Sequence, residues 1–166
     1  MRIVTATALA LGLLSLSACT KPWKEYSYPT WGFAVSYREV PHTHENPGDP
    51  RTATPHTFQV EAVQGDMDFR VSATDANSPD KTEDQIRASA PNDIIRATSG
   101  TVKGPMKPVT ASGVAGQELT LDRGSDPTER VRIFVVNHKL YQVIAQSPDI
   151  NSPEVAAFLD SFKITK

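Results

Sequence analysis

Short runs of alternating apolar and polar residues, separated by turn residues, constrain the fold of this chain most strongly. The clearest pair flanks Gly65–Asp66, which is typical of a β-hairpin turn. A stretch over 26–37 adds two short strands around a turn from Pro29 to Gly32. The main predicted strands are 57–64, 67–74, 101–109, 114–122, 129–137 and 140–147. The pattern predicts an antiparallel sheet of about six strands.

Two segments have helical periodicity instead. The first begins with a capping box from Thr82 to Gln85 and ends before Gly100, and Pro91 should kink or split it. The second begins with Ser152 as its N-cap. Their apolar faces are Ile86, Ala90 and Ile94 in the first, and Val155, Phe158, Leu159 and Phe162 in the second. The expected fold class is therefore α+β, with the sheet sandwiched by two helices.

The first 18 residues have the layout of a secretory signal, with Arg2 followed by an apolar run over 3–14 and then small residues. As a helix this run is about 18 Å long, too short for a bilayer core of roughly 30 Å. The segment Leu16-Ser17-Ala18-Cys19 resembles the lipobox of bacterial lipoproteins. The resemblance implies a lipid anchor on Cys19, whereas an ordinary signal cleaved near Ala18 is the alternative.

This interpretation divides the chain into a signal peptide (1–18), a lipidated tether (19–25) and a single domain (26–166). It implies a location in the cell envelope, facing the periplasm. In the lipobox family an aspartate after the cysteine favours the inner membrane, so Thr20 favours the outer membrane. Trp23 in the tether either inserts at the membrane interface or packs on the domain edge, and we favour packing.

Composition excludes some classes of partner. The chain has 17 lysines and arginines against 19 aspartates and glutamates, a formal net charge of −2. This balance argues against nucleic acid and against electrostatic attachment to anionic lipid. Cys19 is the single cysteine, so the domain must fold without disulfides.

Several segments of the exported part together resemble the PsbP-like superfamily, which is named for a photosystem II extrinsic protein. They are Tyr28-Pro29, Gly32-Phe33-Ala34-Val35, the strand entry 113–118, the hairpin 132–143 and the helical Phe158-Leu-Asp-Ser-Phe162. The resemblance implies an antiparallel sheet sandwiched between helices. It also implies a role in assembly, stabilisation or binding, because the superfamily has no shared catalytic motif.

One cluster of possible metal ligands lies in 38–56, a segment with four prolines that we expect to lack regular structure. In an extended chain His42 and His44 point the same way. Together with His56 and the carboxylate of Glu45 they could bind zinc or copper. The alternative, which we favour, is that all three histidines are solvated loop residues.

Basic residues offer a second candidate site. Arg70, Arg130 and Arg132, with Lys139, would form a patch able to hold an anionic group if the predicted hairpins bring them together. The alternative is that these charges pair with nearby carboxylates. The candidate partners are Glu118, Asp122 and Glu129.

The sequence thus predicts a non-enzymatic lipoprotein whose domain is a binding or assembly module with an envelope partner. No catalytic motif and no cofactor are predicted. Two alternatives remain open: a metal-binding protein or metal-assisted hydrolase using His42, His44 and His56, and a binder of anionic small molecules.

Overall fold

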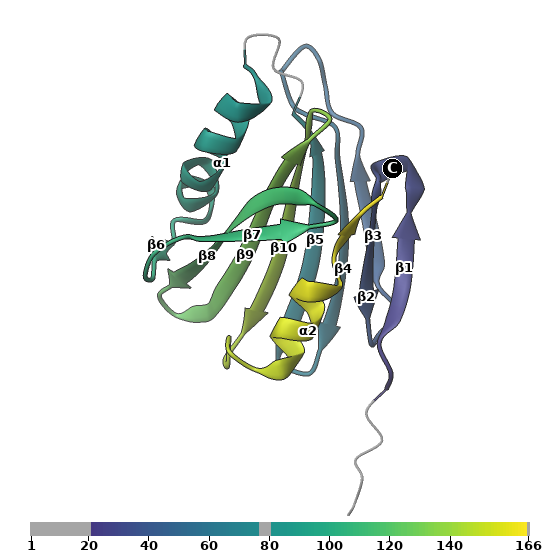
Figure 1. Ribbon diagram of the computed structural model, residues 1–166, viewed down its shortest axis with the longest axis vertical. Helices are drawn as coiled ribbons and strands as arrows, with labels where there is room; N and C mark the ends of the chain where they lie inside the picture. The colour runs from purple at the N-terminus through teal and green to yellow at the C-terminus, as the bar shows by residue number, and fades with distance from the viewer. Residues whose placement is uncertain (1–20, 77–80, 166) are drawn as a thin grey trace, which may run out of the picture.

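The computed structural model describes residues 21–76 and 81–165, which form two antiparallel sheets around a shared core (Figure 1). The strands of the large sheet are β3 (His42–Asn46), β4 (Thr57–Gln64), β5 (Met67–Asp75), β6 (Thr101–Val102), β7 (Lys107–Ala111), β8 (Val114–Arg123), β9 (Asp126–Val136) and β10 (Lys139–Ser147). They are ordered β3-β4-β5-β10-β9-β8-β6, and β7 also pairs with β8. The small sheet is ordered β1-β2-β11, with β1 (Lys24–Tyr28), β2 (Phe33–Tyr37) and β11 (Lys163–Ile164).

The predicted fold class is correct only in its coarse form. A sheet of about six strands between two helices is wrong, because the large sheet has eight strands and a second sheet covers part of one face. The prediction omitted β3, whose side chains are all exposed and polar and therefore lack the alternation of a half-buried strand. The predicted strand 101–109 is two strands, β6 and β7, separated by Gly104-Pro105.

The two faces of the large sheet are covered differently. On one face lies α1 (Glu83–Thr98), whose Ala90 and Ile94 pack on apolar residues of β8, β9 and β10. On the other face lie the small sheet and α2 (Pro153–Ser161), which enclose the aromatic core (Figure 1). The largest fully buried aromatic residues of this core are Phe33, Tyr37, Phe69, Phe134 and Phe158.

The helix starts are confirmed. Thr82 and Gln85 form the capping box of α1, and the Ser152 side chain accepts a hydrogen bond from the Val155 N–H at the start of α2. The prediction that Pro91 could split the first helix is wrong, since α1 continues through it. Pro91 is buried, and its packing offsets the missing backbone hydrogen bond. In the described part of the chain, neither helix is both long and apolar enough to cross a membrane.

The two ends of the large sheet are distinct. The chain enters β1 at the end that also holds the β4–β5 hairpin turn, which we call the entry end (Figure 1). The β3–β4 connection and the start of β10 lie at the opposite end, the far end. Because β10 has nine residues, the two ends are about 30 Å apart.

Regular structure begins earlier in the chain than the sequence predicted. Strand β1 begins at Lys24, two residues before the predicted start of the domain, and Lys21 is ion-paired with Glu39. The packing of Trp23 is confirmed, since its ring lies 6.0 Å from that of Phe69 and 5.1 Å from the Arg38 guanidinium. Cys19, Thr20 and the signal peptide lie outside the described residues.

Candidate binding site

At the far end of the large sheet, four charged or titratable side chains form a connected chain. His56 Nε2 lies 2.8 Å from Glu45 Oε1, and His56 Nδ1 lies 3.4 Å from Asp75 Oδ2. The Lys139 ammonium then donates to Asp75 Oδ1 at 2.6 Å. The four residues come from β3, the β3–β4 connection, β5 and β10, so sheet register brings them together.

Trp31, in the short 3-10 helix (Pro29–Trp31) between β1 and β2, packs against this chain of polar residues. Its ring lies 4.6 Å from the His56 ring, and the Lys139 Nζ lies 4.6 Å from the Trp31 ring centroid, within cation–π range. The Tyr141 hydroxyl donates to the Trp31 carbonyl at 2.9 Å. Burial, with a further contribution from Asp75, raises the pKa of Tyr141, so this hydroxyl stays protonated and remains a donor. We call Trp31, Glu45, His56, Asp75 and Lys139 the far-end site.

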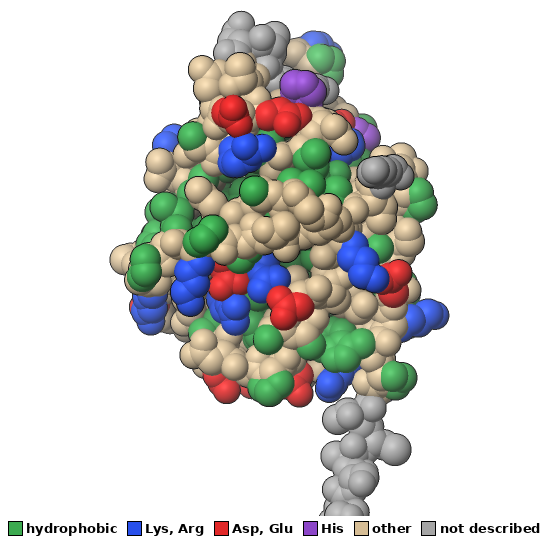
Figure 2. Space-filling view, in the orientation of Figure 1, with side chains coloured by type: hydrophobic (Ala, Val, Ile, Leu, Met, Phe, Trp, Pro, Cys, Tyr) green, Lys and Arg blue, Asp and Glu red, His purple; other side chains and the backbone are tan. Residues whose placement is uncertain are grey.

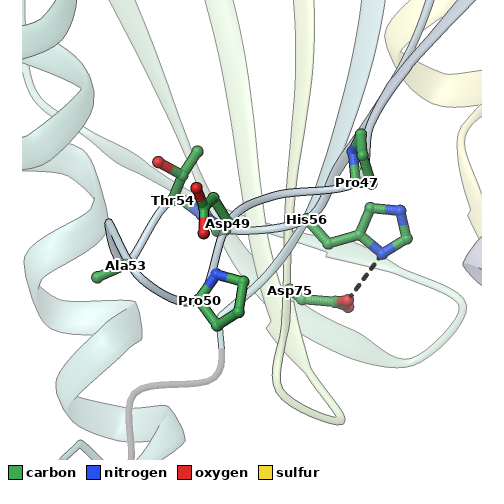
Figure 3. Close-up of a pocket in the computed structure, with 8 residues that line it drawn as sticks. Pro47, Asp49, Pro50, Ala53, Thr54, His56 and Asp75 are labelled. Atoms are coloured by element: carbon green, nitrogen blue, oxygen red, sulfur yellow. Dashed lines mark ion pairs between the residues drawn. The ribbon is translucent and has the colours of Figure 1, made fainter.

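An open hollow with a volume of about 410 Å³ adjoins the far-end site (Figure 3). Its lining residues are Pro47, Asp49, Pro50, Ala53, Thr54, Pro55, His56 and Asp75. A second hollow of about 300 Å³ is lined in part by Trp31 and Glu45. The Glu45–His56 pair therefore lies at the border between the two hollows.

The loop that carries the first hollow is closed by its own hydrogen bonds, and β3 gives part of 38–56 a regular structure that the sequence did not predict. Asp49 and Thr54 exchange two backbone hydrogen bonds and close a tight turn. The Arg51 side chain hydrogen-bonds the Asp49 carboxylate and holds its pKa below the usual range. At Gly48 a Cβ atom would lie 2.7 Å from the Thr54 carbonyl, so glycine permits this close approach.

The three histidines singled out in the sequence do not meet. His42 and His44 lie on one face of β3, whereas Glu45, the partner of His56, points to the other face. Across the described ranges 21–76 and 81–165, no group of three or more His, Cys, Asp or Glu side chains is placed to hold a metal ion. The geometry does not favour the proposed metal site, because strand alternation separates its ligands.

The basic patch is also not formed. In the sheet Arg70 is in register with Ile144, whereas Arg132 is in register with Val143, so these two arginines lie on opposite faces. Lys139 belongs to the far-end site. Arg130 and Arg132 instead pair with Glu118, as in the alternative interpretation.

Glu118 and the two arginines form a buried ion-pair network beside α2, where basic and acidic side chains alternate (Figure 2). The Arg132 guanidinium donates from Nε to Glu118 at 2.8 Å and from Nη1 to the Leu159 carbonyl at 2.9 Å, and its Nη2 lies 2.8 Å from Asp160. Its donors are thus engaged within the protein. Burial alone would raise the pKa of Glu118. Hydrogen bonds from Arg132 and the charge of Arg130 outweigh burial, so the pKa lies below its ordinary value and the carboxylate stays ionised. This network joins the sheet to the end of α2.

Neither Trp31 nor Asp75 is predicted as a site residue from the sequence, and Lys139 is predicted in a different site, the basic patch. The sequence marks two turns, Pro29–Gly32 and Asn137-His138, and the structure brings both to the far end. The sequence does not reveal that β5 pairs with β10, and this pairing is what places Asp75 beside Lys139.

Neither a protein-family model nor a curated protein matches the sequence. A solved structure that is similar is the solution structure of cyanobacterial PsbP (CyanoP) from Synechocystis, with a TM-score of 0.57. The alignment covers 93% of this chain and 97% of that chain, at 11% sequence identity. The fold is PsbP-like. At this identity the similarity is one of fold alone. It confirms that the fold is PsbP-like, whereas the implied sandwich of one sheet between helices is replaced by two sheets.

Within the PsbP-like fold, the far-end site combines side chains from both sheets. Trp31 belongs to the segment between the strands of the small sheet, and the other four residues belong to the large sheet or its β3–β4 connection. The hollow offers proline side chains as apolar walls and is also lined by His56 and by the carboxylates of Asp49 and Asp75. Concave surfaces of this size with a few fixed polar groups are suited to binding.

Proposed function

We propose that this chain is a membrane-anchored bacterial lipoprotein whose PsbP-like domain is a non-enzymatic binding module in the periplasm. Its lipid anchor would be on Cys19, in the lipobox-like Leu16–Cys19. Thr20, in place of aspartate, favours the outer membrane. The partner would be an envelope protein, which inserts an exposed segment into the hollow of about 410 Å³ beside the far-end site.

The observation that carries the binding role is the far-end site beside its hollow. His56, Asp75 and Lys139 are half-buried and fixed by mutual contacts, so they present polar groups with little loss of side-chain entropy. The neighbouring prolines add apolar surface that is already rigid.

The contacts of His56 support binding over catalysis. Each ring nitrogen faces a carboxylate oxygen, that of Glu45 or that of Asp75. The imidazole is thus used to join β3, the loop and β5. General-base catalysis instead needs a ring nitrogen within hydrogen-bond reach of the proton that is removed.

The location of the site supports an anchored module. A tether from Cys19 would reach the domain at its entry end, and the far end lies about 30 Å away along the strands. The hollow would therefore point away from the membrane, where an envelope protein can reach it.

We expect a photo-crosslinking amino acid at Pro50, which lines the hollow, to capture one partner in intact cells. The same amino acid at Met106, an exposed residue between β6 and β7, should not capture it. His56→Ala should reduce the Pro50 adduct by about tenfold, equivalent to about 1.4 kcal/mol of binding free energy.

His44→Ala is the matched control, because His44 is exposed on the opposite face of β3 and should leave the adduct unchanged. Thermal melts would establish that both histidine variants are folded. The proposal fails if Pro50 and Met106 capture the same proteins, or if loss of His56 leaves the Pro50 adduct undiminished.

A further inference from the structure

An exposed apolar pair lies at the entry end of the large sheet, opposite the far-end site. In the part of the chain that the structure describes, the exposed large apolar side chains are Val40, Val63 and Met106. Val40 is 75% exposed and Val63 is 65% exposed. With Glu39 and His42 they line one shallow groove of about 440 Å³. We call Val40 and Val63 the valine pair.

The valine pair is next to the point where the chain enters the domain. Val40 lies between β2 and β3, and Val63 is close to the turn between β4 and β5. The Lys21 ammonium lies 2.6 Å from the Glu39 carboxylate, so the chain enters the domain beside Val40. Lys21 is two residues after Cys19, so this backbone spans at most about 7 Å.

We infer that the valine pair rests on the lipid bilayer surface and orients the domain with its far-end site pointing away from the membrane. This inference rests on the proposed lipid anchor. A short tether and a chain entry beside Val40 bring the pair to the bilayer in preference to Met106, the other large apolar side chain that is exposed among the described residues. Met106, in contrast, lies beside β7, on the part of the large sheet most distant from β3.

Two valines expose too little apolar area to hold a free domain on a membrane. Anchoring changes this requirement, because contact with the bilayer becomes intramolecular and occurs at a high effective concentration. A weak apolar contact is then enough to select one orientation. Acidic Glu39 and Asp66 accompany basic Lys21 and Lys24 at the entry end, so the contact should depend little on lipid charge.

The test supplies the anchor chemically. The chain from Cys19 onward contains every described residue, and its single thiol can be coupled to maleimide-headgroup lipids in phosphatidylcholine nanodiscs. Lipids with a spin label near the headgroup would broaden the NMR signals of nearby methyl groups. We expect the methyl signals of Val40 and Val63 to broaden several-fold more than the Met106 methyl signal, with or without added phosphatidylglycerol.

The variant Val40→Ser should reduce the broadening at Val63 toward the value at Met106. Val102→Ser, at a half-buried valine of β6 on the opposite edge of the sheet, is a control that should leave it unchanged. Equal broadening at Val40, Val63 and Met106 would overturn the inference, because the domain would then tumble freely on its tether. Broadening or shifts of the valine pair that grow with protein concentration in the absence of lipid would also overturn it, in favour of a second copy of the chain. Because coupling replaces lipidation by the cell, a failure here is distinguishable from a failure of the proposed anchor.

Discussion

Glu118→Ala should lower the free energy of unfolding by about 3 kcal/mol, measured by urea denaturation at neutral pH. The substitution leaves the Arg130 and Arg132 guanidinium groups without their shared carboxylate, although both arginine side chains are more than four-fifths buried. Loss of one partner of a buried ion pair leaves an uncompensated charge, which is the costly case. We place the effect at the lower end of the usual range because Arg132 keeps Asp160 and the Leu159 carbonyl as partners.

Glu25→Ala is the matched control. Glu25 pairs with Lys163, but both side chains are at least half exposed, so the change in unfolding free energy should stay below about 0.5 kcal/mol. Equal effects of the two substitutions would show that the network beside α2 does not stabilise the protein.

The effect of Glu118→Ala should also depend on pH in one direction. The pKa of Glu118 is lower in the folded protein than its ordinary value of 4.5, because the arginine contacts outweigh burial. Its stabilising contribution is therefore complete above that ordinary value and is lost as the pH falls through the lowered pKa of the folded state. The stability difference between the natural protein and the variant should shrink under strongly acidic conditions.

Gly116→Ala should destabilise the protein by about 3 kcal/mol, the upper part of the range for overpacking a core. A Cβ atom at Gly116 would lie 2.4 Å from both the Ile133 carbonyl oxygen and Cδ1 of Phe134. The Phe134 ring is itself stacked on that of Phe162, at 5.5 Å between centroids, so it has little freedom to move. The backbone of β9 would have to shift instead.

Gly65→Ala is the control for backbone effects. Gly65 has φ +64°, but no atom lies within 4 Å of a Cβ atom built there, so its cost should be about 1 kcal/mol from backbone strain alone. Phe134→Leu in the Gly116→Ala background should restore part of the lost stability, as measured in a double-mutant cycle. Equal unfolding free energies for the two glycine variants would contradict the role assigned to the Phe134 contact.

The sequence predicted those elements whose signals are local. The turn at Gly65–Asp66 fixed the hairpin of β4 and β5 to within one residue, and Ser152 marked the start of α2. Strand β3 was not predictable, because an exposed edge strand of polar residues has no burial pattern to reveal it. Strands β1 and β2 form a second sheet with β11, which lies more than 120 residues later in the sequence, so no local pattern reveals this pairing.

The far-end site was predicted only in part, for a similar reason. His56 was predicted as a site residue, but His42 and His44 were assigned as its partners from their spacing along the chain. Strand pairing instead brings Glu45 and Asp75 to His56. Asp75 reaches His56 through the β4–β5 register, and Trp31 reaches it across the two sheets. The predicted basic patch is wrong for the same reason, because it depends on strand pairing. A shift of one residue in register decides which face of the sheet Arg70 occupies.

Placement of the domain on a membrane is the claim on which the proposed function depends. The intact mass of the native protein, extracted from cell membranes with detergent, tests it most directly. We predict a chain that begins at Cys19 and is heavier than its amino acids by a diacylglyceryl group, with a further acyl chain in bacteria that acylate the new amine. A mass equal to that of an unacylated chain, whether it begins at Met1 or after Ala18, would contradict the account.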